Sequence, residues 1–446
     1  MAIPSNVLQT VTTYQETGLP YLENLLPICS AMNAKFKDFQ TKTANLGQSV
    51  NLELPPDSVS ADGLVASFQP SIQLLATLTC DQAKNVSRDF TNQQEVFNLD
   101  ADSYMEKFGK ADVEELANAI EINVAKNFDS SVPVMAINSQ GQSVPTGALH
   151  FESGPYRFFS DGITPINSYQ QLEEAHTSFA GLGTLPDIYV ILPNKSIPKI
   201  IGTGLNQFVP ERNNKDAMSW DLGEFGYPRV KYLRSNILPI HTSGVIGNET
   251  FGSANNFLTV VSTNDPTGQN ITQIVCTTPV SDTAKAIRAG DLGVFVDGVS
   301  GQINMRYLTY RGHAVSSEPV QIRMNVDADS VSTAITISIT PALVSAPGSG
   351  QNLNTPITAG MQIQIMPNHR CGMLVAGNAG YLAMPMLPDE VPYPTASKND
   401  PTTGLSLRTY YGSRFGANQR GMVTDGIWGS LFVPKYCMRL LFPTNV

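Results

Sequence analysis

Hydrophobic and polar residues alternate in two stretches near the start of the chain. The first, residues 50–54, reads VNLEL, and the second, residues 72–79, reads IQLLATLT. A period of two predicts β-strands, and the Pro-, Asp-, Ser- and Gly-rich connection predicts a long hairpin over residues 47–80. A two-stranded hairpin is marginally stable in water. We therefore expect its apolar side to be covered from outside the hairpin, through Val50, Leu52, Leu54, Ile72, Leu74 and Leu78.

The period then changes to that of a helix. Residues 111–128 carry one apolar stripe at a spacing of three to four: Val113, Leu116, Ile120, Val124 and Phe128. Asp112 followed by Glu115 is typical of a capping box, which predicts a helix start at Asp112. We expect the opposite, polar face to carry Glu114, Glu121 and Lys126.

From about residue 150 to residue 240 both periods alternate. Ser168 and Gln171 predict a second capped helix that carries Tyr169, Leu172, His176 and Phe179 and ends at the glycines of residues 181–183. A buried strand DIYVILP, a short helix near Ser196 and a strand RVKYLRSNILPI are expected next. Helices and strands in turn indicate an α/β layer.

Residues 246–367 show no helical period. They contain six runs rich in Thr, Val and Ile, which read FLTVVST, ITQIVCTT, LGVFVDGV, VQIRMNV, TAITISITPAL and MQIQIMP. Short strands between turn residues predict a small β-barrel or sandwich, with an exposed loop at 346–356. The pattern changes back after Asn368, with strands expected at LRTYYGSRFG and SLFVPKYCMRLLFP, so the β block reads as an insertion.

Composition narrows the class of protein. A net charge of −10 argues against a basic surface that grips nucleic acid, and only 15% of the residues are charged. Sparse charge indicates that part of the surface meets other protein. The five cysteines are widely spaced without a CxxC pair, which favours free, buried thiols and a reducing setting. There is no signal-type segment and no apolar run long enough to span a membrane.

Candidate chemistry is sparse. None of the histidines lies in an HxH, HExxH or zinc-type pattern with cysteine; they are His150, His176, His241, His313 and His369. Phosphate-binding loops and nucleophile elbows are also absent. We therefore predict no catalytic residue, no cofactor and no metal, with His176 as a structural histidine. Arg229, Lys231 and Arg234 alternate along one strand, which favours a sheet edge over nucleic-acid binding.

The order of these elements resembles the major capsid (coat) protein of tailed bacteriophages, the Hong Kong 97 fold, and within it the short-tailed-phage type with a β-barrel insertion domain. The resemblance implies an α+β fold divided along nearly the whole chain. Its divisions would be an N-terminal arm (1–45), an extended loop hairpin (46–82), a peripheral domain with a spine helix (83–130), a first axial-domain segment (131–245), the insertion domain (246–367), a second axial-domain segment (368–395) and C-terminal peripheral-domain strands (396–446).

The same resemblance implies a structural protein of the virion and not an enzyme. Hexamers and pentamers of the chain would build an icosahedral shell in the cytoplasm of a bacterial host and enclose double-stranded DNA without sequence-specific binding. The hairpin would then lie on a neighbouring subunit. Some 45 residues without a charged helical run precede the hairpin, which implies a separate scaffolding protein, alongside a portal. The alternative is a cytoplasmic or cell-surface β-rich protein that recognises carbohydrate or protein, and an enzyme ranks third.

Overall fold

The computed structural model describes residues 18–19, 22, 25–33, 47, 49–54, 74–91, 109–129, 132–134, 151–183, 187–200, 230–296, 305–310, 312–348, 350–377, 379–389, 393, 395–400, 404–413 and 419–445. For residues 51, 53–54, 74–77, 89–91, 132–134, 151–153, 413 and 419–420 it describes the backbone alone. The chain forms two compact units. The first combines Met1–Val50, Leu78–Ala125 and Gly380–Leu431; the second combines Asn51–Thr77, Lys126–Ala379 and Phe432–Val446.

The first unit is built on an antiparallel sheet. Its longest strand, β22 (Gln419–Phe432), pairs with β3 (Gln82–Thr91) on one side and with β21 (Ser406–Ser413) on the other. β20 (Thr395–Asn399) pairs with β21, and β19 (Gly380–Ala383) also pairs with β22. Met422, Thr424 and Trp428 of β22 are buried, whereas Val423 and Asp425 are half-buried. One face of the sheet is therefore the more fully covered.

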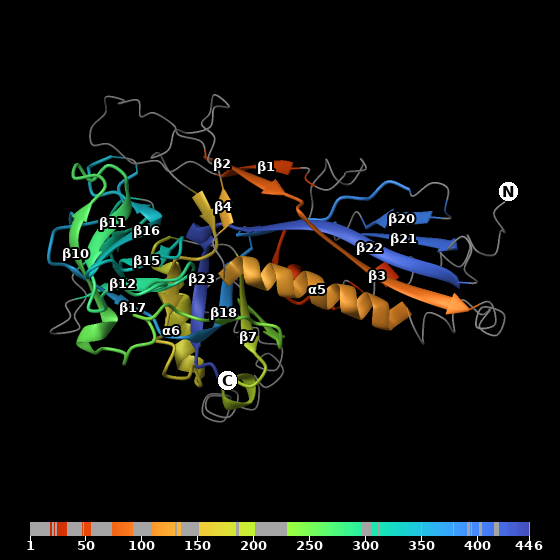
Figure 1. The fold of residues 1–446 in the computed structure, drawn as a ribbon, viewed down its shortest axis with the longest axis horizontal. Coiled ribbons are helices and arrows are strands. Elements are labelled where there is room, and N and C mark those ends of the chain that lie inside the picture. The colour runs from red at the N-terminus through yellow and green to blue at the C-terminus, as the bar shows by residue number, and fades with distance from the viewer. Residues whose placement is uncertain are drawn as a thin grey trace, which may run out of the picture. The chain divides into compact units, whose positions relative to one another are not determined.

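Helix α5 (Lys110–Asp129) covers that face (Figure 1). The indole Nε1 of Trp428 donates to Asn123 at 3.0 Å, and Asn123 donates to Gln82 of β3 at 3.1 Å. All five residues of the predicted apolar stripe, Val113 to Phe128, are fully buried. The helix and its inward face are confirmed.

Two details of the prediction for this helix are wrong. The helix begins at Lys110, so Asp112 lies within the first turn and pairs with Arg88 of β3 at 2.5 Å instead of capping. Glu121 is fully buried, not solvent-facing, because the backbone of Ile28 and Cys29 packs on that side of the helix. Glu114 and Lys126 are exposed as expected.

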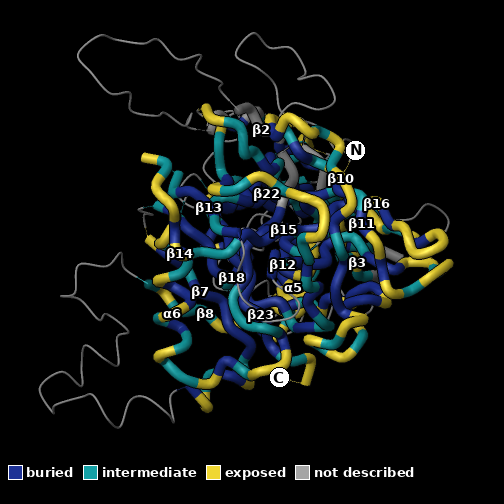
Figure 2. The backbone as a smooth tube through the Cα atoms, turned by 90° about the vertical axis from the view of Figure 1, so that its left-hand side faces the viewer, coloured by how far each residue is buried: buried dark blue, intermediate teal, exposed yellow. Residues whose placement is uncertain are grey.

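The second unit contains a sheet with the strand order β6 (Arg157–Phe159), β23 (Cys437–Phe442), β18 (His369–Ala376), β7 (Ile188–Pro193), β8 (Val230–Ser235). β9 (Ile240–His241) also pairs with β18. Every residue of β23 is buried, and so is almost all of β18 (Figure 2). These two strands form the centre of the sheet. The predicted strand at residues 430–443 is in fact interrupted by a turn of 3-10 helix at Pro434–Tyr436, so β22 and β23 enter different sheets.

Helix α6 (Tyr169–Ala180) of this unit has the predicted capping box. Gln171 N donates to Ser168 Oγ at 3.3 Å, the Gln171 side chain accepts from Ser168 N, and the helix ends at Gly181. Residues 197–200 are helical as well, close to the predicted start at Ser196. On β8, which is the edge strand in the described part of this sheet, Lys231 and Arg234 are exposed, and the Lys231 ammonium lies 5.2 Å from the Tyr189 ring. Arg229 lies outside the described residues.

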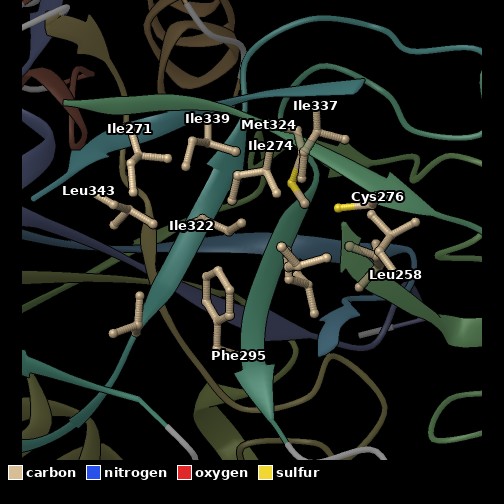
Figure 3. Close-up of a cluster of buried hydrophobic side chains, with 14 of the residues drawn as sticks. Leu258, Ile271, Ile274, Cys276, Phe295, Ile322, Met324, Ile337, Ile339 and Leu343 are labelled. Carbon is tan, nitrogen blue, oxygen red and sulfur yellow. The ribbon is translucent and has the colours of Figure 1, made fainter. Parts of the chain in front are cut away.

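Six further strands of the second unit close into a barrel. Its strand order is β10 (Phe257–Thr263), β11 (Ile271–Thr277), β16 (Ala334–Leu343), β15 (Gln321–Met324), β12 (Leu292–Val296), β17 (Gln362–Ile365) and back to β10. All six predicted strands are present. Their inward side chains, such as Phe295, Ile322 and Ile274, converge on a hydrophobic core (Figure 3). A hairpin of β13 (Arg306–Leu308) and β14 (Val315–Pro319) is paired separately.

The barrel leaves and rejoins the sheet at one place. His241, the last residue of β9, is the pairing partner of His369, the first residue of β18. Residues 242–368 therefore form an excursion between two neighbouring positions. The loop predicted to be exposed at 346–356 is only partly so, because Leu353 is fully buried and pairs with Tyr307.

Short paired strands complete the described structure: β1 (Ser49–Leu54) with β2 (Leu74–Thr79), and β4 (Val132–Val134) with β5 (Phe151–Ser153). In the described part, turns of 3-10 helix lie at Cys29–Ala31 and Ala254–Asn256. Strands outnumber helices there, so the α+β prediction is right only in part and the fold is mostly β. The five cysteines are free and buried, as predicted.

Candidate functional site

Charged side chains from several elements of the second unit meet at one buried point. We call this cluster the ionic joint and define it by its members: Asp129, His241, Asp291, Arg323, His369 and Arg439. They come from the end of α5, β9, the residue before β12, β15, β18 and β23. The joint therefore connects the helix end, the central sheet and the barrel.

His241 is the centre of the joint. Its Nδ1 lies 3.0 Å from Asp129 Oδ1, and its Nε2 lies 2.8 Å from Asp291 Oδ1. Both ring nitrogens face carboxylates, and only the imidazolium form can donate from both. Burial alone would lower the pKa of His241, but the carboxylates of Asp129 and Asp291 outweigh it and raise the pKa. The side chain is 4% exposed, so this cation belongs to the interior.

Asp129 is surrounded by positive charge. Arg439 NH1 lies 3.0 Å from its Oδ1, Arg439 NH2 donates to its backbone carbonyl at 3.1 Å, and Arg323 donates to the same carbonyl. Burial acts to raise the pKa of Asp129, but Arg439, His241 and Arg323 hold it well below the ordinary value of 3.8. The carboxylate is therefore ionised, and two arginines also bind the last carbonyl of α5, where a helix favours cations.

The other members are held by backbone groups. Asp291 Oδ2 accepts from the N–H groups of Gly244 at 3.1 Å and Arg288 at 2.8 Å. His369 Nδ1 lies 2.7 Å from the carbonyl of Pro367, which makes it a donor, and its Nε2 then accepts from Arg439 at 3.3 Å. Burial, with Arg439 and His241 nearby, lowers the pKa of His369 well below its ordinary value. His241 thus donates from both ring nitrogens and His369 from one, and the two ring centroids lie 5.2 Å apart.

The residue types in the joint are those that catalysis uses, but the geometry gives them another task. Cys371 Sγ lies 3.5 Å from Asp129 Oδ1, and burial together with that carboxylate raises the pKa of the thiol, so it is not a thiolate nucleophile. Asp291, His369 and Arg439 are fully buried and out of reach of a substrate. Among the described residues, no three His, Cys, Asp or Glu side chains are placed to hold a metal ion. The arrangement fixes elements to one another.

A second polar contact joins the barrel to the sheet. The amide of Gln321 in β15 accepts from Phe158 N at 3.0 Å and donates to Phe158 O at 2.7 Å, as a neighbouring strand would do. Beside it, Arg157 donates to the α6 carbonyls of Phe179 at 2.9 Å and Ser178 at 2.5 Å. Phe158 also packs with Leu292, Met366 and Leu441. Strands β15 and β12 of the barrel are thus fixed to β6 of the sheet by hydrogen bonds and apolar contacts.

The predicted contact residues of the hairpin are placed unevenly. Leu52 and Leu78 are buried, at 7% and 2% exposure, and Val50 is half-buried. Leu54 and Leu74 lie in β1 and β2, where only the backbone is described. Ile72 lies outside the described residues. Leu52 and Leu78 are therefore buried by the chain itself. The contact of the hairpin with another subunit stays a prediction.

The barrel surface has a depression beside β10. This depression of about 250 Å³ lies between β10 and residues 356–359, and Asp265, Ile271 and Ser345 contribute to its wall. The Asp265 carboxylate is already occupied by the backbone N–H groups of Thr267, Gln269 and Asn270. The wall therefore offers a ligand a mixture of hydroxyl groups and apolar side chains.

No family model matches the chain, and no curated protein matches it either. Among solved structures it is similar to the capsid structure of the cyanophage P-SCSP1u, with 12% identity over 92% of this chain and 89% of that chain and a TM-score of 0.36. It is also similar to the capsid of Ralstonia phage GP4, with 7% identity, 93% and 92% coverage and a TM-score of 0.37. A third is the mature capsid of bacteriophage PhiM1, with 9% identity, 93% and 89% coverage and a TM-score of 0.35.

No short motif predicts the ionic joint, but two arginines in apolar strands are a signal for it. Arg439 stands alone in the strand CMRLLF, and Arg323 stands in QIRM, and every residue of both strands is buried. A lone arginine inside a buried apolar strand indicates an internal ion pair, because an unpaired buried charge is too costly.

In the described part of the chain, no helix has the length and apolar character needed to span a membrane.

Proposed function

We propose that the chain is the major capsid protein of a tailed bacteriophage, of the Hong Kong 97 type with a β-barrel insertion domain. Its copies would form the hexamers and pentamers of an icosahedral shell around double-stranded DNA. A separate scaffolding protein and a portal would take part in assembly in the host cytoplasm. The net charge of −10 suits a shell that confines DNA without gripping it.

The observation that carries the proposal is the order of elements along the chain. A hairpin is followed by a long helix on an antiparallel sheet, then a second sheet, a closed barrel and a return to both sheets. The barrel begins and ends at the paired residues His241 and His369, as an insertion into an existing fold would. The ionic joint supports the same view, since it uses buried charges to hold an inserted barrel in a fixed position.

The hairpin suits a contact with a second copy. β1 and β2 form a sheet of two strands, and no third strand joins them in the part of the chain that the structure describes. Leu52 and Leu78 are already buried within the chain. In this proposal Leu54, Ile72 and Leu74, with Val50, meet the neighbouring subunit, which supplies the second layer that a lone hairpin lacks.

Assembly of the purified full-length chain tests the proposal. Sedimentation velocity and negative-stain microscopy should show closed shells, tubes or capsomers, with the scaffolding protein added if needed. The alternative, a β-rich protein that recognises carbohydrate or protein, is favoured by the depression beside β10. Monomers that bind a glycan through that depression, and never assemble, would support it instead.

A further inference from the structure

A segment near the N-terminus packs on the side of α5 that the sheet leaves open. We call its described residues, 18–19, 22 and 25–33, the strap. Most of its described apolar side chains are buried, namely Leu19, Leu22, Leu26, Ile28, Cys29, Ala31 and Met32, whereas Leu25 and Pro27 are half-buried. The strap ends by pairing with β19, where Asn33 N donates to Gly380 O at 2.8 Å and Leu382 N donates to Asn33 O at 3.1 Å.

One side chain of α5 holds the middle of the strap. Glu121 is fully buried, and its Oε1 accepts from Ile28 N at 2.9 Å and from Cys29 N at 3.0 Å. Its other oxygen, Oε2, is buried without a hydrogen-bond partner. The strap therefore depends on a carboxyl group that is only half satisfied.

No cation offsets this carboxyl group among the residues that the structure describes. The titratable group that faces it is the Cys29 thiol of the strap, whose own pKa is raised, first by burial and then by Glu121. An ionised carboxylate in such a place loses hydration without gaining an ion pair, which is costly. Burial therefore raises the pKa of Glu121 to about 7, against the lowering effect of the N–H and thiol of Cys29 and of the N–H of Ile28.

The raised pKa of Glu121 determines how stability depends on pH at this site. A carboxyl whose pKa is higher in the folded state contributes stability below its ordinary value of 4.5, and that contribution is lost as the pH rises through about 7. The neutral acid keeps both N–H donors on Oε1. The ionised form regains hydration only when the strap lifts.

We propose that Glu121 is a proton-dependent catch for the strap: the neutral carboxylic acid keeps the strap on α5, and its ionisation releases the strap. Release would uncover the apolar side of α5 under the strap. The fold of the sheet does not depend on this step, because α5 is held on its other side by Trp428 and Arg88.

Hydrogen exchange of the full-length protein tests the catch. The amides of Ile28 and Cys29 are compared at pH 6 and pH 8, after correction for the intrinsic rate of exchange. Because pH 8 is one unit above the pKa of the catch, their protection should fall about tenfold relative to the β22 amides. Glu121→Gln keeps a neutral acceptor and should retain protection at both values, whereas Glu115→Gln, on the exposed face of α5, should behave as wild type.

Two results would overturn the proposal. Protection of the strap in the wild-type protein that is equal at both pH values would show that ionisation of Glu121 does not matter. A fall in protection that the β22 amides share would show general unfolding instead of release. Both readouts come from the wild-type chain, so they hold even if the glutamine variant folds poorly.

Discussion

Two acidic residues on one helix show how differently a protein can bury a carboxyl group. Asp129 at the end of α5 faces Arg439, His241 and Arg323, and its pKa lies well below the ordinary value. Glu121, two turns earlier, faces backbone N–H groups and a thiol, and burial raises its pKa to about 7. Burial opposes ionisation at both places, so cations in contact decide the outcome. The first carboxylate suits a permanent joint, and the second suits a releasable one.

The largest expected effect comes from removing the main cation at Asp129. Arg439→Met should leave Asp129 as a buried, poorly compensated charge and destabilise the second unit by about 3–5 kcal/mol. The loss should shrink at low pH, where Asp129 becomes protonated and resembles Glu121. Urea unfolding and hydrogen exchange of β18 and β23 would measure it. Arg234→Met, on the exposed edge of the same sheet, is the control and should change stability by less than about 0.5 kcal/mol. An equal loss in both variants would contradict the comparison.

His241, the second cation beside Asp129, sets the upper pH limit of the joint. Because the pKa of His241 is raised, its contribution to the free energy of unfolding is present below the ordinary value of 6.5 and is lost as the pH rises through the folded-state pKa. The pKa of Asp129 is lowered, so its contribution is present above 3.8 and is lost in acid. The joint should therefore be strongest between about pH 4 and pH 6.5.

His241→Asn should cost roughly 2–3 kcal/mol in that range, since it leaves buried carboxylate oxygens without a charged donor. The difference from wild type should narrow above the folded-state pKa. Urea midpoints measured from pH 5 to pH 10 would show this convergence. His313→Asn, at a half-buried position outside the joint, is the control. A His241→Asn deficit that grows with pH would mean that the sign of the linkage is wrong.

The smallest effect is expected at an exposed ion pair of the barrel. Lys285 Nζ lies 3.2 Å from Asp327 Oδ2, but the two side chains are 59% and 44% exposed. Solvent screens such a pair, so Lys285→Ala should change stability by at most about 0.5 kcal/mol, and less in high salt. A loss above 2 kcal/mol in thermal unfolding would show that burial is not what separates strong from weak charge pairs here.

Periodic patterns predicted the regular parts of the fold well. The six barrel strands and α5 were recognisable because each alternates or repeats its apolar residues against one core. β3 was missed, since its sequence QAKNVSRDFT has no apolar alternation and most of its described side chains are exposed. Such a strand is defined by its long partner β22, which local sequence does not reveal.

The charged sites were harder to predict for a related reason. Glu121 was placed on the solvent side because a helix pattern assumes one covered face, whereas α5 is covered by both the sheet and the strap. The members of the ionic joint are up to 310 residues apart in sequence, so no local motif unites them. Their single signal was an arginine within a buried strand.

The contact of the hairpin with a second copy is the central claim, and one pair of variants tests it directly. Leu54→Lys with Leu74→Lys places two charges on the proposed contact, where each lost apolar side chain would remove roughly 1.5–3 kcal/mol per interface. Asn51→Lys with Gln73→Lys adds the same charge at positions that alternate with the apolar ones. Circular dichroism and sedimentation are measured at wild-type concentration.

We expect both double variants to fold as the wild type does, and only the asparagine and glutamine variant to form closed shells. Closed shells from the leucine double variant would contradict the intersubunit contact. An unfolded leucine variant would place these residues in the core of the subunit itself.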